Sequence, residues 1–348
     1  MMSHIEEHYS SMEKINISVI VPVYGVEQYI ERCANCLFGQ TMTEGVEFIF
    51  INDSTKDRSI ELLTSIISEF PQVKSRVKII NHHRNRGLAA ARQTGFDAAR
   101  GEYILHLDSD DYFELDMLEV MYEAALATKA DIVVSDFFMS LKKGDEYREC
   151  PLYDSKESMF KSMIAPWRYG NKTVGPCVWN KLIKRSIIKE HNINSIEGIN
   201  HGEDFIIISQ ILYYAEEITK VNRAFVHYNK QNLGSYTNDK SASNTLQRIK
   251  ATEIVATFLS QKGISCDEEL DEKRFIEKLI GLANCEKDYL HEFFILYPWL
   301  DYEKNKHLVA PYWRLPYKFA LEGKTGLFVF LRNLIIPIRK INRLIHGR

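Results

Sequence analysis

The sequence of 348 residues contains neither of the glycine-rich loops by which two large enzyme classes hold phosphate. No Gly-x4-Gly-Lys-Ser/Thr segment occurs, and no Gly-x-Gly-x-x-Gly segment follows a predicted strand. These absences argue against a nucleoside triphosphatase and a dinucleotide-dependent oxidoreductase. No uncharged apolar run reaches the roughly 18 residues of a membrane-spanning helix. The formal net charge of −3 offers no general attraction to nucleic acid, so any phosphate binding must be local.

Cysteine is also scarce, with six residues scattered along the sequence and no secretory leader before them. We therefore expect reduced thiols and a cytoplasmic protein. Cys33 and Cys36 have the spacing of a redox motif, but they fall inside a predicted amphipathic helix. No second pair is present to complete a zinc site. We interpret these two cysteines as packing residues.

The N-terminal part of the sequence repeats a unit of apolar strand, polar loop and amphipathic helix. Such repeats predict a parallel, right-handed wound α/β sheet whose polar loops emerge on one edge. Gly101 is expected to cap the third helix. The strands are predicted at residues 17–23, 46–51, 77–80 and 102–107, and the helices at 26–38, 58–70, 88–99 and 114–129.

The later sequence is less regular. A strand is predicted at 131–138, an irregular segment at 141–171 that includes a helix at 155–164, a helix from His201 to Tyr214 and a strand at 224–228. From about Asn238 the pattern becomes helical. The predicted organisation is an extension at 1–15, an α/β domain at 16–238 with halves at 16–125 and 126–238, and a helical region at 239–348.

Three carboxylates lie within residues 108–111, directly after the predicted strand at 102–107. A divalent cation prefers oxygen ligands and offsets the repulsion between crowded acids. The alternative is an acidic turn that caps the next helix. In a parallel sheet, Tyr24, Asp53 and the segment from Arg84 to Arg86 would reach the same edge as the acids. That convergence favours a binding crevice.

Five segments in this order resemble the motifs of family 2 inverting glycosyltransferases of the bacterial surface-polysaccharide type. The resemblance is close over residues 17–125 and looser over 174–240. It implies a GT-A fold, a nucleotide-sugar donor, most often a UDP-sugar, and a Mn²⁺ or Mg²⁺ ion. The segments are residues 19–24, 52–54, 85–93, 101–104 and 107–112.

The resemblance implies roles for residues at the predicted sheet edge. Pro22 and Tyr24 match the motif that lines the uracil pocket, and Asp53 matches the acid that recognises the base. An aromatic ring stacks on a base and a carboxylate accepts its N–H, although a strand-end aromatic and a turn-forming Asp are alternatives. The usual two acids and a glycine are replaced here by Asn52, Asp53 and Ser54. Base preference is therefore less certain.

Further matches concern the phosphate end of the donor. Asn85 and Arg92 match positions that contact ribose or diphosphate. Asp108 and Asp110 match the two acids of the Asp-x-Asp motif, with Asp110 expected on the metal and Asp108 on the ribose or the metal. Asp111 is expected to be structural, as a cap of the next helix.

Catalysis and acceptor binding are expected to come from the second half of the domain. An inverting transfer needs a base for the acceptor hydroxyl, and Asp204 matches the base of the family's Glu-Asp motif. The alternative for this acid is an N-terminal helix cap. Glu203 is expected to orient the acceptor or the base. Trp179, Asn180 and Lys181 resemble the family's acceptor region, with core packing as the competing account for Trp179.

The C-terminal tail at 327–348 is basic and amphipathic, and Pro337 is expected to kink or split any helix there. Such a tail suits a membrane interface, or else packing on its own domain or a partner. We predict a hexosyl- or N-acetylhexosaminyltransferase at the inner face of the cell membrane, acting on a glycan or lipid-linked acceptor in polysaccharide biosynthesis. Alternatives are a sugar nucleotidyltransferase and a nucleotide-sugar-binding module without turnover. The transferred sugar, acceptor, linkage and oligomeric state are not encoded in recognisable motifs.

Overall fold

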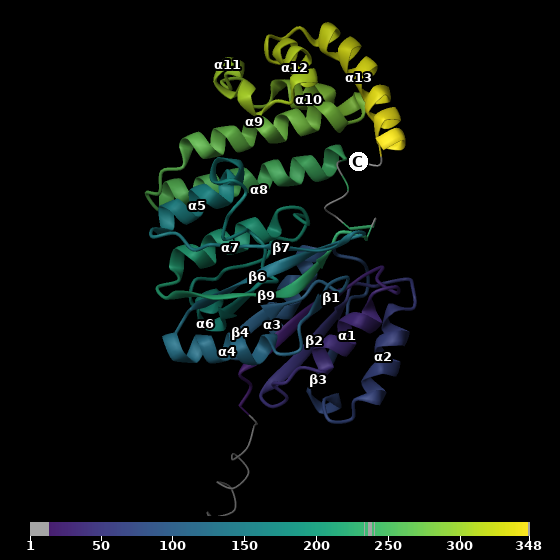
Figure 1. Ribbon diagram of the computed structural model, residues 1–348, viewed down its shortest axis with the longest axis vertical. Coiled ribbons are helices and arrows are strands. Elements are labelled where there is room, and N and C mark those ends of the chain that lie inside the picture. Colours follow the sequence, from purple (N-terminus) through teal and green to yellow (C-terminus); the bar gives the residue numbers. More distant parts are fainter. Residues whose placement is uncertain (1–13, 233, 236–238, 240, 347–348) are drawn as a thin grey trace, which may run out of the picture. The chain divides into compact units, whose positions relative to one another are not determined.

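The computed structural model describes residues 14–232, 234–235, 239 and 241–346, and the side chains among them as far as residue 336. The chain divides into two compact units, Met1–Gly234 and Ser235–Arg348. The first is an α/β unit and the second is helical (Figure 1). Most of the predicted extension at 1–15 lies outside the described residues.

The α/β unit alternates strands and helices along the chain. Its elements are β1 (Ile17–Val23), α1 (Ile30–Phe38), β2 (Val46–Asn52), α2 (Ser59–Glu69), β3 (Val77–Asn81), α3 (Leu88–Ala98), β4 (Tyr103–His106), β5 (Tyr112–Phe113), α4 (Met117–Thr128), β6 (Ile132–Leu141), β7 (Gly144–Arg148), α5 (Lys156–Ile164), β8 (Lys181–Lys184), α6 (Arg185–Glu190), α7 (Glu203–Tyr214) and β9 (Ile218–Asn229).

All nine strands form one sheet in the order β3-β2-β1-β4-β8-β6-β9-β5, with β7 paired to β6. The four N-terminal strands are parallel, as predicted. Strand β8 then runs antiparallel to both β4 and β6, and the short β5 runs antiparallel to β9. The sheet is therefore mixed. The strand order reverses beside β1, and ligands bind at such a reversal in open α/β sheets.

Both faces of the central strands are covered, because every residue of β1 is buried. Helices α1 and α2 contribute to the core on one face. Helix α3 lies close to β1, and Gly95 permits this, since a Cβ there would lie 2.2 Å from the Ile20 side chain. Cys33 and Cys36 are buried thiols in α1, which confirms the packing interpretation. Burial raises the pKa of Cys36 to about 12.

Some local predictions were wrong. Gly101 does not cap α3, which ends at Ala98; instead it lies against β1, where a Cβ would be 2.5 Å from Ser18 N. Helix α1 begins at Ile30 rather than at residue 26, after a turn in which Glu27 N donates to Asp57. The short strands β5, β7 and β8 were not predicted, because they are too short or too polar to show a period of two.

The helical unit has its own core, in which Phe275, Phe293, Trp313 and Phe328 are buried. Pro337 does not split the last helix, which continues through that position. None of the helices in the described residues is long and apolar enough to span a membrane. The elements are α8 (Ala242–Gln261), α9 (Asp267–Asn284), α10 (Leu290–Ile295), α11 (Tyr302–Asn305), α12 (Arg314–Leu321) and α13 (Thr325–His346).

Candidate active site

Asp53 joins two of the loops at the carboxyl edge of the sheet. Its carboxylate is almost completely buried and accepts hydrogen bonds from the backbone N–H groups of Arg86 at 2.8 Å and Gly87 at 2.7 Å. The same carboxylate lies 2.7 Å from His82 Nδ1. These contacts hold the loop between β3 and α3 against the loop after β2. Contact between Asp53 and the nucleotide base stays a prediction. The contacts that the structure shows hold the two loops together.

Ser54 occupies the position at which the family pattern has glycine, and its backbone is left-handed, with φ +58°. A residue with a Cβ pays about 1–2 kcal/mol to adopt this conformation, whereas glycine does not. Glycine loses more conformational entropy on folding, and this loss cancels part of the gain. We expect Ser54→Gly to stabilise the protein by about 0.5–1 kcal/mol. The urea unfolding midpoint measures the change. In the control Ser65→Gly, within α2, the same replacement should destabilise; a loss of stability in both variants would contradict the strain.

The loop after β1 is tied to the loop after β2. Gly25 N donates to Thr55 Oγ1 at 2.9 Å. Tyr24, just before Gly25, is 47% exposed, so a flat ligand has access to its ring. Pro22 is buried in β1, in register with Ile51, beyond the part of β1 that pairs with β4. A residue without an N–H is tolerated there.

Asn85 and Arg86 lie on the exposed loop between β3 and α3. Arg86 forms a two-pronged ion pair with Glu197, at 2.8 Å between Nη2 and Oε2. Behind them Gly87 has φ +88°, and a Cβ there would lie 2.3 Å from Asn200. Asn200 Oδ1 also accepts from Ala89 N at 3.0 Å, in the first turn of α3. A side chain from the second half of the unit thus fixes the start of α3.

The acidic loop follows β4 at the same edge. Asp108 is partly exposed, and Asp110 accepts a hydrogen bond from Asn232 Nδ2 at 2.8 Å. Burial and repulsion by Asp108 raise the pKa of Asp110. Asp111 is fully buried and accepts from Asn229 N at 2.7 Å. Its expected role as a helix cap is wrong, because α4 begins only at Met117, and it anchors the loop to the end of β9 instead.

Arg92 connects the acidic loop to the start of α7. Its side chain is only 1% exposed, and its Nη2 donates to Asp108 at 2.9 Å. Its Nε lies 3.2 Å from Asp204 Oδ1 and 3.6 Å from Glu203 Oε1. Three acids from two distant segments thus surround one buried guanidinium. Donor contact by Arg92 stays a prediction, and the contacts that the structure shows for its side chain are those with the three acids.

Asp204 lies in the first turn of α7 without capping it. One carboxylate oxygen is near Arg92, and the other accepts from Val178 N at 3.4 Å. Burial raises the pKa of Asp204; Arg92 opposes this shift and Asp108 adds to it. Burial and the neighbouring Asp204 also raise the pKa of Glu203. Ionisation of Asp204 thus disfavours ionisation of Glu203 beside it.

Trp179, Asn180 and Lys181 are all buried. Trp179 packs edge-on against Phe137 at 4.9 Å and stacks on Tyr228 at 5.4 Å. Asn180 Oδ1 accepts from Lys181 Nζ at 2.8 Å. These contacts support the packing alternative, so the three side chains are not carried into a proposed acceptor site.

Lys181 also supports the segment that touches Asp204. Its Nζ donates to Cys177 O at 2.8 Å, and the next residue, Val178, donates its N–H to Asp204. Sequence reasoning missed this support, and it missed the hydrogen bonds that Asn229 and Asn232 donate to the acidic loop. The polar run that begins at the end of β9 was the only signal in the sequence for these two asparagines.

The acids fit a divalent cation that is shared with a phosphate ligand. The described residues hold no group of three or more His, Cys, Asp or Glu that could bind an ion alone. Mg²⁺ is usually bound by one or two carboxylates together with water and substrate phosphates. Asp108 and Asp110 supply such a pair, and burial together with repulsion by Asp108 raises the pKa of Asp110, an effect that a bound cation would offset.

Comparison with known proteins places these features in a family. A model of glycosyl transferase family 2 matches residues 18–191. The putative glycosyltransferase EpsH of Bacillus subtilis is 31% identical over 219 residues, which cover 62% of this chain and 61% of EpsH. The cholesterol galactosyltransferase of Borreliella burgdorferi is 29% identical over 263 residues, covering 73% and 70%. This chain therefore spans less than two thirds of EpsH.

Solved structures share the fold. TarS 1–349 of S. aureus in complex with UDP superposes with a TM-score of 0.58 at 17% identity, covering 92% of this chain and 90% of that one. The mannosyltransferase PcManGT of Pyrobaculum calidifontis, with GDP-Man and Mn²⁺, gives a TM-score of 0.54 at 11% identity, covering 94% and 90%. The match of the family model over half of the sequence, together with the mixed wound sheet, confirms the predicted fold class. The chain belongs to glycosyl transferase family 2 and has a GT-A fold with additional C-terminal helices.

Proposed function

We propose that the protein transfers a sugar from a nucleotide-sugar, with UDP-sugars as the first candidates, to a hydroxyl of a glycan or lipid-linked acceptor, with inversion and with a divalent metal. One observation carries this proposal: a single buried guanidinium, that of Arg92, contacts both Asp108 and Asp204. The acid expected at the donor's phosphates and the acid expected to be the base therefore lie close together, on either side of Arg92.

Asp108 and Asp110 would hold Mn²⁺ or Mg²⁺ together with the diphosphate. When bound, the ion supplies positive charge that stabilises the departing nucleoside diphosphate. Tyr24 offers an exposed ring for the base. UDP, UDP-GlcNAc and GDP-Man are bound in structural neighbours of this chain, which supports a nucleotide-sugar as the donor class.

Asp204 is proposed as the general base of a single displacement. The acceptor oxygen forms a bond to the anomeric carbon while the bond from that carbon to the diphosphate oxygen breaks. The acceptor's proton passes to the Asp204 carboxylate. Val178 N and Arg92 orient this carboxylate, so that it is fixed before the acceptor arrives.

Incubating the purified protein with Mn²⁺, an acceptor mixture and UDP-sugars or GDP-Man tests the function. Release of the nucleoside diphosphate is expected with at least one donor. Binding of a nucleotide-sugar without release in any mixture would favour a binding module. Pyrophosphate release from UTP and a sugar phosphate would indicate a nucleotidyltransferase.

Asp110→Asn tests the metal site without changing the shape of the side chain. We expect it to weaken UDP binding in the presence of Mn²⁺ by about 10- to 100-fold, because the pair loses one of its two charges. Isothermal titration with and without Mn²⁺ measures the effect. Asp97→Asn, on α3, removes a charge of the same kind and serves as the control. Unchanged Mn²⁺-dependent affinity in Asp110→Asn would refute the metal assignment.

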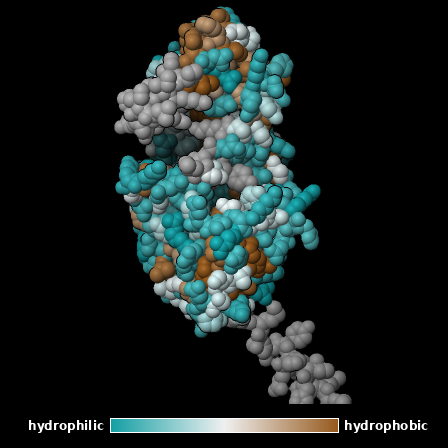
Figure 2. Space-filling view, turned by 90° about the vertical axis from the view of Figure 1, so that its right-hand side faces the viewer, coloured by the Kyte–Doolittle hydropathy of each residue, from teal (hydrophilic) through white to brown (hydrophobic). Residues whose placement is uncertain are grey.

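The outer face of α13 supports contact with an anionic membrane. Phe328 is buried, and Arg332 donates to Cys285 O, whereas Leu327, Phe330 and Leu334 are 49, 62 and 51% exposed. Their spacing of three and four residues places them on one side of the helix. Figure 2 shows hydrophobic residues on the helical unit at the top of the view. Residues 327–348 contain five Lys or Arg and no Asp or Glu.

Leu334→Asp is therefore expected to reduce binding to vesicles that contain phosphatidylglycerol by about tenfold or more. The change removes apolar area that would enter the membrane, and the new carboxylate is repelled by the anionic lipid. Co-sedimentation measures the bound fraction. Leu126→Asp is a matched control, since Leu126 in α4 is exposed to a similar extent, 53%. Equal loss in both variants, or none in Leu334→Asp, would contradict membrane contact through this face.

A further inference from the structure

Four side chains from four elements form a continuous stack behind the acidic loop. The guanidinium of Arg32 in α1 lies 4.1 Å from the ring centroid of Tyr112 in β5. Tyr112 stacks on His227 of β9, with centroids 4.3 Å apart and planes 8° apart. His227 in turn stacks on Phe138 of β6 at 4.7 Å. We call these four residues the column. No step of the proposed transfer uses any of them.

His227 is the central member, and both of its ring nitrogens face carboxylates. Nδ1 lies 2.8 Å from Asp145 Oδ2, and Nε2 lies 2.7 Å from Glu114 Oε1. His227 as a residue is only 7% exposed. Two acids from different segments thus hold the His227 ring in a fixed plane, and Tyr112 stacks on that ring.

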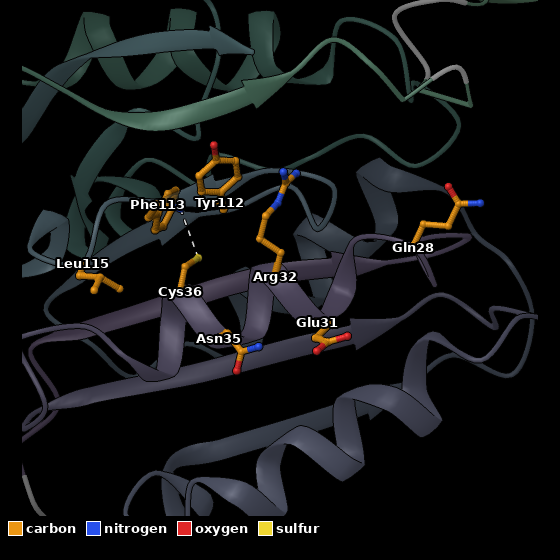
Figure 3. A pocket seen from close by; sticks show the side chains of 8 residues that line it. All are labelled: Gln28, Glu31, Arg32, Asn35, Cys36, Tyr112, Phe113 and Leu115. Atoms are coloured by element: carbon orange, nitrogen blue, oxygen red, sulfur yellow. Dashed lines mark hydrogen bonds between the residues drawn. The ribbon is translucent and has the colours of Figure 1, made fainter. Parts of the chain in front are cut away.

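The other end of the column reaches the acidic loop. Arg32 Nη2 donates to the main-chain oxygen of Asp110 at 3.1 Å. Arg32 and Tyr112 lie next to each other on the wall of a surface pocket of about 580 Å³ beside α1 (Figure 3). In the same pocket, Phe113 N donates to Cys36 Sγ at 3.2 Å. The backbone on both sides of Asp111 is therefore held from the direction of α1.

We propose that the column positions Asp110 for the metal and the diphosphate, with His227 as its central positioning residue. The inference rests on the proposed metal-dependent function, and it assigns to His227 and Arg32 a role that neither has through contact with substrate. In His227→Phe a ring remains but its contacts with Asp145 and Glu114 are lost, so nothing fixes the plane of the ring on which Tyr112 stacks. Without Arg32, the Asp110 carbonyl loses the shorter of its two hydrogen bonds and keeps only that from Asn229 Nδ2 at 3.3 Å.

The test compares UDP affinity with and without Mn²⁺. The ratio of the two dissociation constants, the metal gain, reports how well the acids and the diphosphate share the ion. We expect His227→Phe and Arg32→Met each to reduce the metal gain by about tenfold, the scale typical of residues that support metal ligands. The affinity without metal should stay close to that of the wild type. Arg32 is exposed, so its replacement does not threaten the fold.

The direction of the Arg32→Met effect is informative. Removing a cation beside a metal site strengthens metal binding if charge alone matters. A weaker metal gain is therefore expected only if Arg32 acts by holding the loop.

His191→Phe is the matched control, because His191 also stacks on a tyrosine, Tyr214, at 3.7 Å. It should leave both affinities unchanged. A metal gain retained in His227→Phe and Arg32→Met, or an equal loss with and without metal, would overturn the positioning role alone. Absence of any metal gain in the wild type would overturn the metal-dependent function and this inference with it.

Discussion

Asp204→Asn is expected to lower the turnover of sugar transfer by about 10²- to 10⁴-fold while leaving UDP binding nearly intact. The amide keeps the shape of the side chain and still accepts from Val178 N, but it cannot take the proton of the acceptor hydroxyl. Initial rates of nucleoside diphosphate release give the turnover, and isothermal titration gives the affinity. Full transfer activity in Asp204→Asn would refute the base assignment.

The pH profile and a neighbouring variant sharpen this test. Burial raises the pKa of Asp204, and only the ionised carboxylate acts as a base. Activity is therefore expected to fall as the pH decreases through that raised pKa, above the value of about 3.9 for an ordinary Asp. Glu203→Gln is the control, because it also replaces an acid near Arg92 by its amide but leaves the proposed base in place. A much smaller loss of turnover is expected.

Arg92→Met is expected to destabilise the protein by about 3–5 kcal/mol, because the buried acids lose the positive charge that compensates them. Met fills most of the space of the Arg stem but cannot pair with Asp108, Glu203 or Asp204. Urea unfolding followed by circular dichroism measures the loss. Transfer activity should fall as well, since the same contacts hold Asp108 and Asp204 in place.

Two comparisons separate the charge from the packing. Arg86→Met also removes an arginine from an ion pair, but that pair is exposed, so little change in stability is expected. The double variant Arg92→Met/Asp204→Asn removes one of the uncompensated acids and should recover part of the lost stability. If Arg92→Met is as stable as the wild type, or the double variant is less stable than Arg92→Met, the buried charge network does not have this role.

The first strands of the sheet were predictable because most of their residues are apolar and many are β-branched. Strand β1 has the bounds that were expected, and β2 and β3 each extend one residue further. The parallel order then brings the loops with Tyr24 and Asp53 to the edge that carries the acidic stretch. That level of inference needs only the period of the pattern and the handedness of the connections.

The detailed roles were not predictable, because they depend on partners that are distant in the sequence. Nothing local to Arg92 indicates burial; its partners follow strand β4 and begin helix α7. The same holds for Asp111. Its position in the sequence suggests a helix cap, and only the structure shows that it accepts a hydrogen bond from Asn229 N at the end of β9. Trp179 resembled a sugar-stacking residue, but the contacts with Phe137 and Tyr228 place it in the core.

The pairing of β5 with β9 has a consequence for synthesis of the chain. The acidic loop is complete in a nascent polypeptide long before β9 (Ile218–Asn229) leaves the ribosome, yet Tyr112, Asp110 and Asp111 all depend on contacts from the end of that strand. Non-local pairing of this kind forms late in folding. A fragment that ends at residue 191, where the family model ends, would carry the acids without the strand that arranges them. If Asp110 serves the donor as proposed, we expect the shortest fragment that binds a donor to include Asn232, whose amide donates to Asp110.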